Sequence, residues 1–163
     1  MVASRLERSR QSGLHAVVDA SQEEAENAVR RLTGERGADT GFESTRSPAA
    51  FRTLLRMAAL GGRVVMVGSV HATAELDLFE DLQRKELTII GAWQPRAPIV
   101  AHPQYRWSQE TNRQVFLDLL QTGTVQVDHL ITHRARPAEA VALYETMAAG
   151  AGEWMGVLFA WDQ

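Results

Sequence analysis

Three short apolar segments, separated by stretches with helical periodicity, constrain the fold of this chain more than any other feature. They are Thr40–Glu43, Gly62–Gly68 and Leu87–Ala92. The middle segment is a nearly continuous valine-rich run, which is typical of a strand that a parallel sheet buries on both faces. Strands that alternate with helices predict an α/β fold. We therefore expect consecutive strands of one open, mostly parallel sheet with helices on both faces.

The N-terminal part of the chain predicts two helices and a strand between them. Residues 3–12 form a mostly polar helical pattern that ends at Gly13, a residue suited to a left-handed cap. The segment His15–Ala20 has the composition of a short buried strand. Ser21 and Glu24 have the spacing of a capping box, which predicts that the second helix begins there.

Further helices follow the first two of the three apolar segments. Ser47 followed by Pro48 is a helix start, because serine caps the free amides and proline suits the first helical position. The glycine pair Gly61-Gly62 is expected to end this helix and to begin the next strand. The expected buried face of the helix that begins at Ser47 consists of Phe51, Leu54, Leu55 and Ala58. A shorter helix is expected before the third strand, around Leu78, Phe79 and Leu82.

The rest of the chain begins with a proline-rich loop, Trp93–Trp107, which cannot be a regular helix or a central strand. A helix is expected from Ser108, a strand over Val125–Ile131, and a helix from Pro137. A terminal strand is expected over Trp154–Trp161. The residues expected to face inward from the helix that begins at Pro137 are Val141, Tyr144 and Met147.

Composition excludes several classes of function. The net charge of −3 and the pI near 5.9 do not indicate a nucleic-acid surface or a polybasic membrane patch. The absence of cysteine excludes disulfides, thiolate catalysis and cysteine-bound zinc within these residues. The start of the sequence has no apolar core of signal-peptide length, and the longest apolar run, Trp154–Trp161, is too short to span a bilayer. We therefore expect a cytoplasmic protein.

The order and spacing of several sequence blocks resemble the C-terminal half of the zinc-type medium-chain alcohol dehydrogenases. The resemblance extends over nearly the whole chain. It rests on the blocks Ala38–Ala50 (ADTGFESTRSPAA), Gly61–Gly68 (GGRVVMVG) and Lys85–Gly91 (KELTIIG), and continues through Asn112–Arg113, Phe116–Leu120 and Leu130–Arg134. It implies a partial Rossmann-like coenzyme domain. We expect residues 1–163 to form one truncated domain of this kind, with the family's C-terminal tail from about residue 135 to 163.

The resemblance also implies what these residues do not supply. In that family the zinc ligands, the G-x-G-x-x-G turn and the acidic residue that holds the ribose precede the position that matches residue 1. The family's strand order, 3-2-1-4-5-6, would place the missing strands between His15–Ala20 and Thr40–Glu43. An open sheet edge invites pairing. We expect the remaining pieces to close up directly and the chain to dimerise, although a second copy or a separate polypeptide could also supply the missing edges.

The carboxyl ends of the parallel strands form the expected ligand crevice, as in other open α/β sheets. The resemblance implies that five positions lie near the nicotinamide and its ribose: Thr45, Gly68, Ser69, Val70 and Ala92. NAD(P) is therefore the expected cofactor. Its binding is expected to be weak, because the pyrophosphate loop that anchors a dinucleotide has no counterpart here. No zinc or other metal is expected in this chain.

Two other groups of residues are candidates for chemistry, each with a structural alternative. Glu43 and His71 could form an acid–base pair at the crevice, or they could be a helix-capping carboxylate and a solvated loop histidine. In the proline-rich loop, His102 and Tyr105 could act in catalysis, and with Trp93 and Trp107 they could form an aromatic lid or simply pack on the sheet edge.

A third group, His129, His133 and Asp128, has metal-ligand residue types, but in an extended segment that does not place them on one face. Surface or turn positions are the expected role of these histidines.

Three functions remain open from the sequence. The first is a truncated dehydrogenase-like protein of the oxidoreductase class, with redox activity doubtful for this chain alone. The second is a small cofactor-independent enzyme, such as an isomerase, cyclase or lyase, that uses the same crevice for a small-molecule ligand. The third is a non-catalytic oligomerisation partner. In intact family members the last strand of the coenzyme sheet pairs with its copy, so Leu87–Ala92 is the expected homodimer edge.

Overall fold

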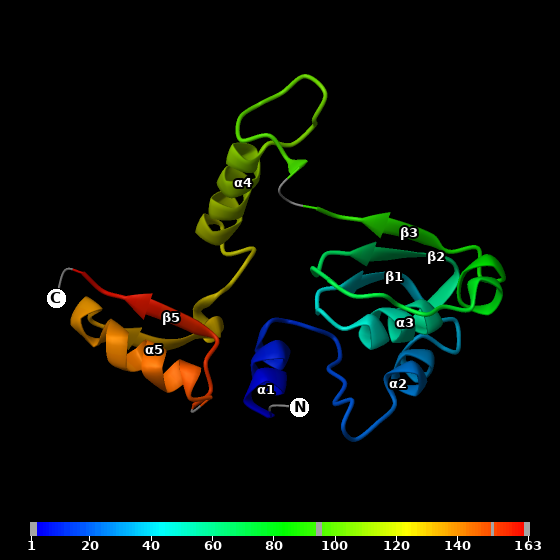
Figure 1. The fold of residues 1–163 in the computed structure, drawn as a ribbon, viewed down its shortest axis with the longest axis horizontal. Coiled ribbons are helices and arrows are strands. Elements are labelled where there is room, and N and C mark those ends of the chain that lie inside the picture. The colour runs from blue at the N-terminus through cyan, green and yellow to red at the C-terminus, as the bar shows by residue number, and fades with distance from the viewer. Residues whose placement is uncertain (1–2, 94–95, 151, 162–163) are drawn as a thin grey trace. The chain divides into compact units, whose positions relative to one another are not determined.

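The computed structural model describes residues 3–93, 96–150 and 152–161 (Figure 1). The chain divides into two compact units. The first unit comprises residues 18–108, and the second comprises the described residues of 2–17 and 109–163. No helix in the described ranges is long and apolar enough to cross a membrane.

The first unit contains a three-stranded parallel sheet. Strands β1 (Ala38–Glu43), β2 (Ala58–Met66) and β3 (Thr88–Gly91) lie in that order, with β2 in the middle (Figure 1). Val64 pairs with Gly41 on one side and Ile89 on the other. The expectation of consecutive parallel strands in one sheet is confirmed.

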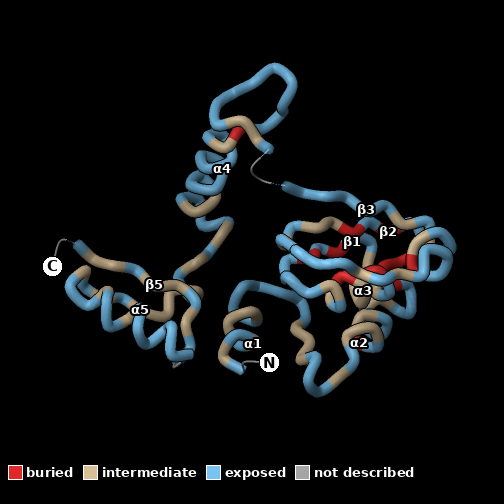
Figure 2. Tube along the Cα trace, in the orientation of Figure 1, coloured by how far each residue is buried: buried red, intermediate tan, exposed pale blue. Residues whose placement is uncertain are grey.

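Helix α3 (Pro48–Met57) connects β1 to β2 and covers both strands. It begins as expected, with the Ser47 hydroxyl accepting a hydrogen bond from the Ala50 amide at 3.3 Å. Phe51 and Leu55 from this helix pack with Val64 of β2, and all three are buried. Figure 2 shows that the buried residues concentrate around β1, β2 and α3. The core of this unit therefore holds the carboxyl ends of β1 and β2 at fixed positions.

The described part of the first unit also contains two short helices. Helix α2 (Ala25–Leu32) packs against α3, and the π-type helix η1 (Leu78–Gln83) follows β2 and also contacts α3. The latter confirms the helix expected around Leu78. Asp77 caps η1, since its Oδ1 accepts hydrogen bonds from the amides of Phe79 and Glu80, both at 3.0 Å.

Three expectations about local structure in this unit are wrong. The segment His15–Ala20, whose last three residues belong to the first unit, forms no strand. It therefore does not close up against β1, which pairs only with β2 among the described residues. Ser21 does not cap α2, because its amide and hydroxyl both donate to Asp19 Oδ1, at 2.9 and 2.6 Å.

The glycine pair that was expected to end α3 lies inside β2 instead. Gly61 has a φ of +71°, and the pairing of β1 with β2 shifts register between Ala38 and Thr40, opposite this segment. A residue with positive φ at a register shift is typical of a β-bulge. The strand therefore begins at Ala58, four residues before the expected start, and bends at the bulge.

The second unit contains two parallel strands and several helices. Strand β4 (Ile131–Ala135) pairs with β5 (Gly156–Phe159), and α5 (Ala140–Ala148) lies between them in the chain. The other described helices are α1 (Ala3–Gln11), α4 (Gln109–Gln121) and the 3-10 helices η3 (Asp128–Leu130) and η4 (Pro137–Glu139). The helices expected over 3–12, from Ser108 and from Pro137 are confirmed, as is a terminal strand within Trp154–Trp161.

Two expectations in the second unit are wrong. Residues 125–131 do not form a strand, because η3 occupies 128–130 and the strand starts only at Ile131. Val141, Tyr144 and Met147 do not face inward from α5, since 71%, 64% and 39% of their surface is exposed. The apolar face of α5 is thus uncovered within the described residues.

Candidate functional site

Backbone hydrogen bonds join the loops at the carboxyl ends of the three parallel strands. The carbonyl of Glu43, the last residue of β1, accepts from the amides of Val67 and Gly68, both at 2.8 Å. At the next strand, the amide of Ala92 donates to the carbonyl of Met66 at 2.9 Å. The crevice expected from the sequence therefore has a backbone frame that connects all three strand ends.

The Glu43 side chain is buried at this frame, with 3% of its residue surface exposed. Its Oε1 accepts hydrogen bonds from both the amide and the hydroxyl of Thr45, the amide at 2.6 Å. Its Oε2 is buried and has no hydrogen-bond partner in the described part of the chain. A buried carboxylate oxygen without a donor is costly, so this atom is suited to accept a hydrogen bond from a ligand.

Gly68 lies so close to Glu43 and Thr45 that no side chain fits. A Cβ atom there would lie far inside van der Waals contact with the Thr45 carbonyl oxygen, and 2.7 Å from Glu43 Oε2. The requirement for glycine comes from this close approach of two loops, since the φ of Gly68 is not in the left-handed region. Two of the five residues expected near a nicotinamide, Thr45 and Gly68, are thus brought into direct contact.

The other three residues of that set lie on the same edge. Ser69 and Val70 continue the loop after Gly68, and Ala92 directly follows β3. The amide of Val70 donates to the carbonyl of Gly68 at 3.1 Å, which tightens the loop. Ser69 and Ala92 are exposed, so their surfaces remain free to contact a ligand.

The proposed acid–base pair of Glu43 and His71 is not formed in the structure. Glu43 Oε1 is engaged by Thr45, Oε2 has no hydrogen-bond partner among the described residues, and His71 is exposed. The role of Thr45 as the donor to Glu43 was missed in the sequence. The signal that could have indicated this hydrogen bond is the two-residue spacing of Glu43 and Thr45 at a strand end. Polar side chains in such positions often bond to groups two residues further along the chain.

The proline-rich loop brings His102 and Tyr105 together. Their rings meet edge to face with centroids 5.6 Å apart, and the Tyr105 amide donates to the His102 carbonyl at 3.0 Å. A hydrogen bond with Tyr105 raises the pKa of Arg96 above its ordinary value. Trp93 and Trp107 are exposed to 72% and 47%, so neither is buried by packing on the sheet edge.

The histidines considered as metal ligands each have a separate partner. His129 Nε2 lies 2.6 Å from the Ser12 hydroxyl, while the ring of His133 stacks on Trp154 at 4.0 Å. The described residues contain no group of three or more His, Asp or Glu side chains that could hold a metal ion. The described residues thus offer no ligand set for the zinc of a dehydrogenase.

Comparison with known proteins assigns the family. The family model described as zinc-binding dehydrogenase matches residues 1–112. L-threonine 3-dehydrogenase from Bacillus licheniformis is 34% identical over 146 residues, which are 90% of this chain but 39% of that enzyme. The chain thus spans about a third to two fifths of the length of these curated relatives.

Solved structures agree on the fold. Alcohol dehydrogenase from Thermus sp. ATN1 is 26% identical, with a TM-score of 0.74 over 98% of this chain and 41% of that one. An alcohol dehydrogenase from Escherichia coli CFT073, solved with its cofactor NADH, is 19% identical with a TM-score of 0.73, over 98% and 42% of the two chains. The family match over more than half of the residues and these shared folds show that the chain belongs to the zinc-binding dehydrogenase family.

Proposed function

We propose that this chain supplies the nicotinamide side of the coenzyme cleft of an NAD(P)-dependent dehydrogenase. The observation that carries the proposal is the crevice at the strand ends, where the buried, unpartnered Oε2 of Glu43 lies beside the tightly packed Gly68 loop. Ligands of open α/β sheets bind at this edge. The relative solved with NADH supports the choice of coenzyme.

The role of each residue follows from its position in the crevice. The Oε2 of Glu43 can accept one hydrogen bond from an amide or hydroxyl of the coenzyme, while its Oε1 is held by Thr45. The absence of a side chain at Gly68 lets this loop pack closely on Glu43 and Thr45, and the exposed Ser69 beside it can contact the coenzyme. Hydride transfer is the chemistry a bound nicotinamide supplies. Polarising the substrate oxygen by zinc requires ligands that these residues do not provide.

Binding to this chain should depend on the nicotinamide part of the coenzyme alone. A dinucleotide is normally anchored by its pyrophosphate on a glycine-rich turn, and the sequence has no such turn. The reduced nicotinamide mononucleotide should therefore bind this chain about as well as NADH or NADPH does, and AMP should not compete. Tryptophan fluorescence quenching measures all four ligands on the 163-residue chain.

A matched pair of variants locates the binding. Val70→Arg adds a long side chain at the crevice and should abolish quenching by the mononucleotide, while Val141→Arg on the exposed face of α5 should leave it unchanged. The proposal is wrong if no nicotinamide ligand binds, or if Val70→Arg binds as well as the unsubstituted chain.

We also propose that the chain forms a homodimer through Leu87–Ala92. All four residues of β3 are exposed, and β3 pairs only with β2 among the described residues. An unpaired apolar strand edge is a ready template for a second copy.

A further inference from the structure

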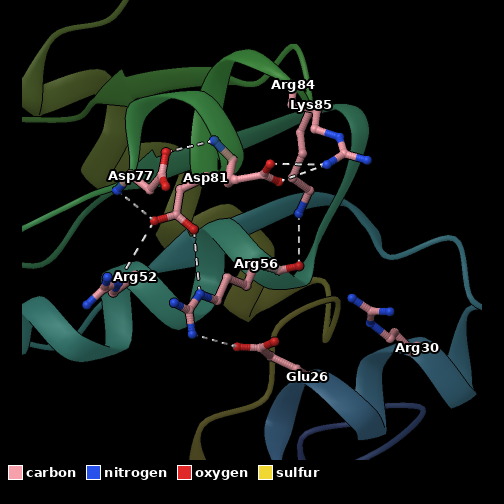
Figure 3. Close-up of a pocket in the computed structure, with 9 residues that line it drawn as sticks. Glu26, Arg30, Arg52, Arg56, Asp77, Asp81, Arg84 and Lys85 are labelled. Atoms are coloured by element: carbon pink, nitrogen blue, oxygen red, sulfur yellow. Dashed lines mark hydrogen bonds and ion pairs between the residues drawn. The ribbon is translucent and has the colours of Figure 1, made fainter.

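A cavity lies at the other end of the same sheet. It has a volume of about 600 Å³ and is lined by α2, α3, η1 and the residues just before β3 (Figure 3). Arg56 at the end of α3 and Lys85 lie before β2 and β3, which places the cavity at the amino ends of these parallel strands. It is therefore separate from the crevice at their carboxyl ends, and its size is within the range of small-molecule sites.

All the side chains that line this cavity are charged, and most of them neutralise one another. Arg84 pairs with Glu80 at 3.1 Å, and Arg56 lies 3.5 Å from the buried Asp81. Arg52 Nε, which is itself buried, lies 3.9 Å from Asp81 Oδ2, too far for a hydrogen bond. Asp81 is thus shared between two arginines.

Two further lining carboxylates are also engaged. Glu26 lies 3.8 Å from Arg56, and Asp77 accepts hydrogen bonds from two amides at the start of η1. The five basic and four acidic lining groups leave one net positive charge. Each lining carboxylate therefore already has an ion-pair or hydrogen-bond partner, and the excess positive charge lies with the cations that have no ion pair.

Those cations are Arg30 and Lys85. In Figure 3 no dashed line joins the guanidinium of Arg30 to another of the residues drawn, and no ion pair of either cation occurs among the described residues. Lys85 Nζ donates to the backbone carbonyls of Leu55 and Arg56 at 2.8 and 2.9 Å, which leaves its third hydrogen free. Burial lowers the pKa of Lys85, and the charge of Arg30 lowers it further. Glu26 and Asp81 act in the opposite direction on this pKa, but both carboxylates also lie within 4 Å of Arg56.

We propose that this cavity binds a small phosphorylated anion, with Arg30 and Lys85 as its principal ligands. An arginine fork matches the geometry of a phosphoryl group, and a lysine adds a compact charge. A phosphate anion would offset the positive charges of Arg30 and Lys85, and the volume allows a phosphate monoester as well as free phosphate.

Lys85 provides a direct readout, because it is the only lysine in the sequence. A chain labelled with ¹³C and ¹⁵N in lysine gives a single side-chain amine signal. Inorganic phosphate should shift this signal saturably at pH 7 and raise the pKa of Lys85, while chloride at the same ionic strength should not. Phenyl phosphate in a parallel titration shows whether the monoester binds more tightly than the free ion.

Two neighbouring variants on α2 complete the test. Arg30→Gln should weaken phosphate binding about ten-fold, as expected for one lost charge-assisted hydrogen bond. Arg31→Gln removes the same charge from the adjacent residue, which pairs with Glu23 outside the cavity, and should bind phosphate as the unsubstituted chain does. A signal that phosphate does not shift, or equal binding by the two variants, would overturn the proposal.

Discussion

Replacing Gly68 by alanine tests the close approach of the two loops at the crevice. The added Cβ would collide with the Thr45 carbonyl and lie 2.7 Å from Glu43 Oε2 and 2.9 Å from the carbonyl carbon of Ser44. Two of these three atoms belong to the backbone, so relief requires the whole loop to move. Overpacking of this kind costs about 1–3 kcal/mol. This movement of the loop would also weaken the 2.8 Å hydrogen bond from the Gly68 amide to the Glu43 carbonyl.

Gly91→Ala is the matched control, since Gly91 ends a neighbouring strand and its Cβ would meet nothing within 4 Å. Alanine there should be neutral or stabilise by up to about 1 kcal/mol, because glycine in a strand loses more entropy on folding. Thermal unfolding followed by far-UV circular dichroism compares the two variants. Gly68→Ala should lower the midpoint of thermal unfolding by about 2–12 °C for a chain of this size. Equal stabilities of the two variants would refute the steric argument.

Three further predictions concern the core, the charged cavity and the sheet edge. Leu55→Ala should cost about 2–5 kcal/mol in urea denaturation, because Leu55 is fully buried among Phe51 and Val64. The pKa of Lys85 is lower in the folded chain than the unfolded value of about 10.4, so between these two pKa values the unfolded chain binds more protons. Stability should therefore rise with pH across that window, and Lys85→Met should remove this slope. Ile89→Glu should convert the proposed dimer to a monomer in light scattering; a dimer that persists would contradict the assignment of the edge.

The parallel sheet could be predicted because its signals are local and agree with one another. The valine-rich run around Val64, the helix start at Ser47 and Pro48, and the buried spacing of Phe51 and Leu55 all indicate a strand–helix–strand unit. The carboxyl ends of such strands share one edge, so the positions of the crevice residues followed from the strand assignment alone.

The errors arose where pairing or side-chain competition decides the structure. The four small or medium-sized aliphatic residues of His15–Ala20 are too few to hold a strand without a neighbour, and Asp19 forms a local turn with Ser21 instead. The bulge at Gly61 depends on its register against β1, which no local pattern encodes. Backbone pairing between distant segments is the deciding factor in both cases.

The charged cavity had no sequence signal, because its residues come from three separate segments. Glu26 and Arg30 lie on α2, Arg56 on α3 and Asp81 on η1, and each looks like an ordinary surface charge on its own helix. Only the packing of α2 and η1 against α3 brings these charges together. The single lysine among sixteen arginines was visible in the composition, yet its position beside Arg30 was not.

The two sites at opposite ends of the sheet should respond independently, because they share no lining residue. The crevice depends on Glu43 and Gly68, the cavity on Arg30 and Lys85, and effects at sites without shared partners usually add. Arg30→Gln should therefore leave quenching by the nicotinamide mononucleotide unchanged, and Gly68→Ala should leave the phosphate shift of the Lys85 signal intact at temperatures where the chain stays folded. A variant that loses both responses would show that the assays report unfolding of the first unit, whereas separate losses would assign each ligand to its own end of the strands.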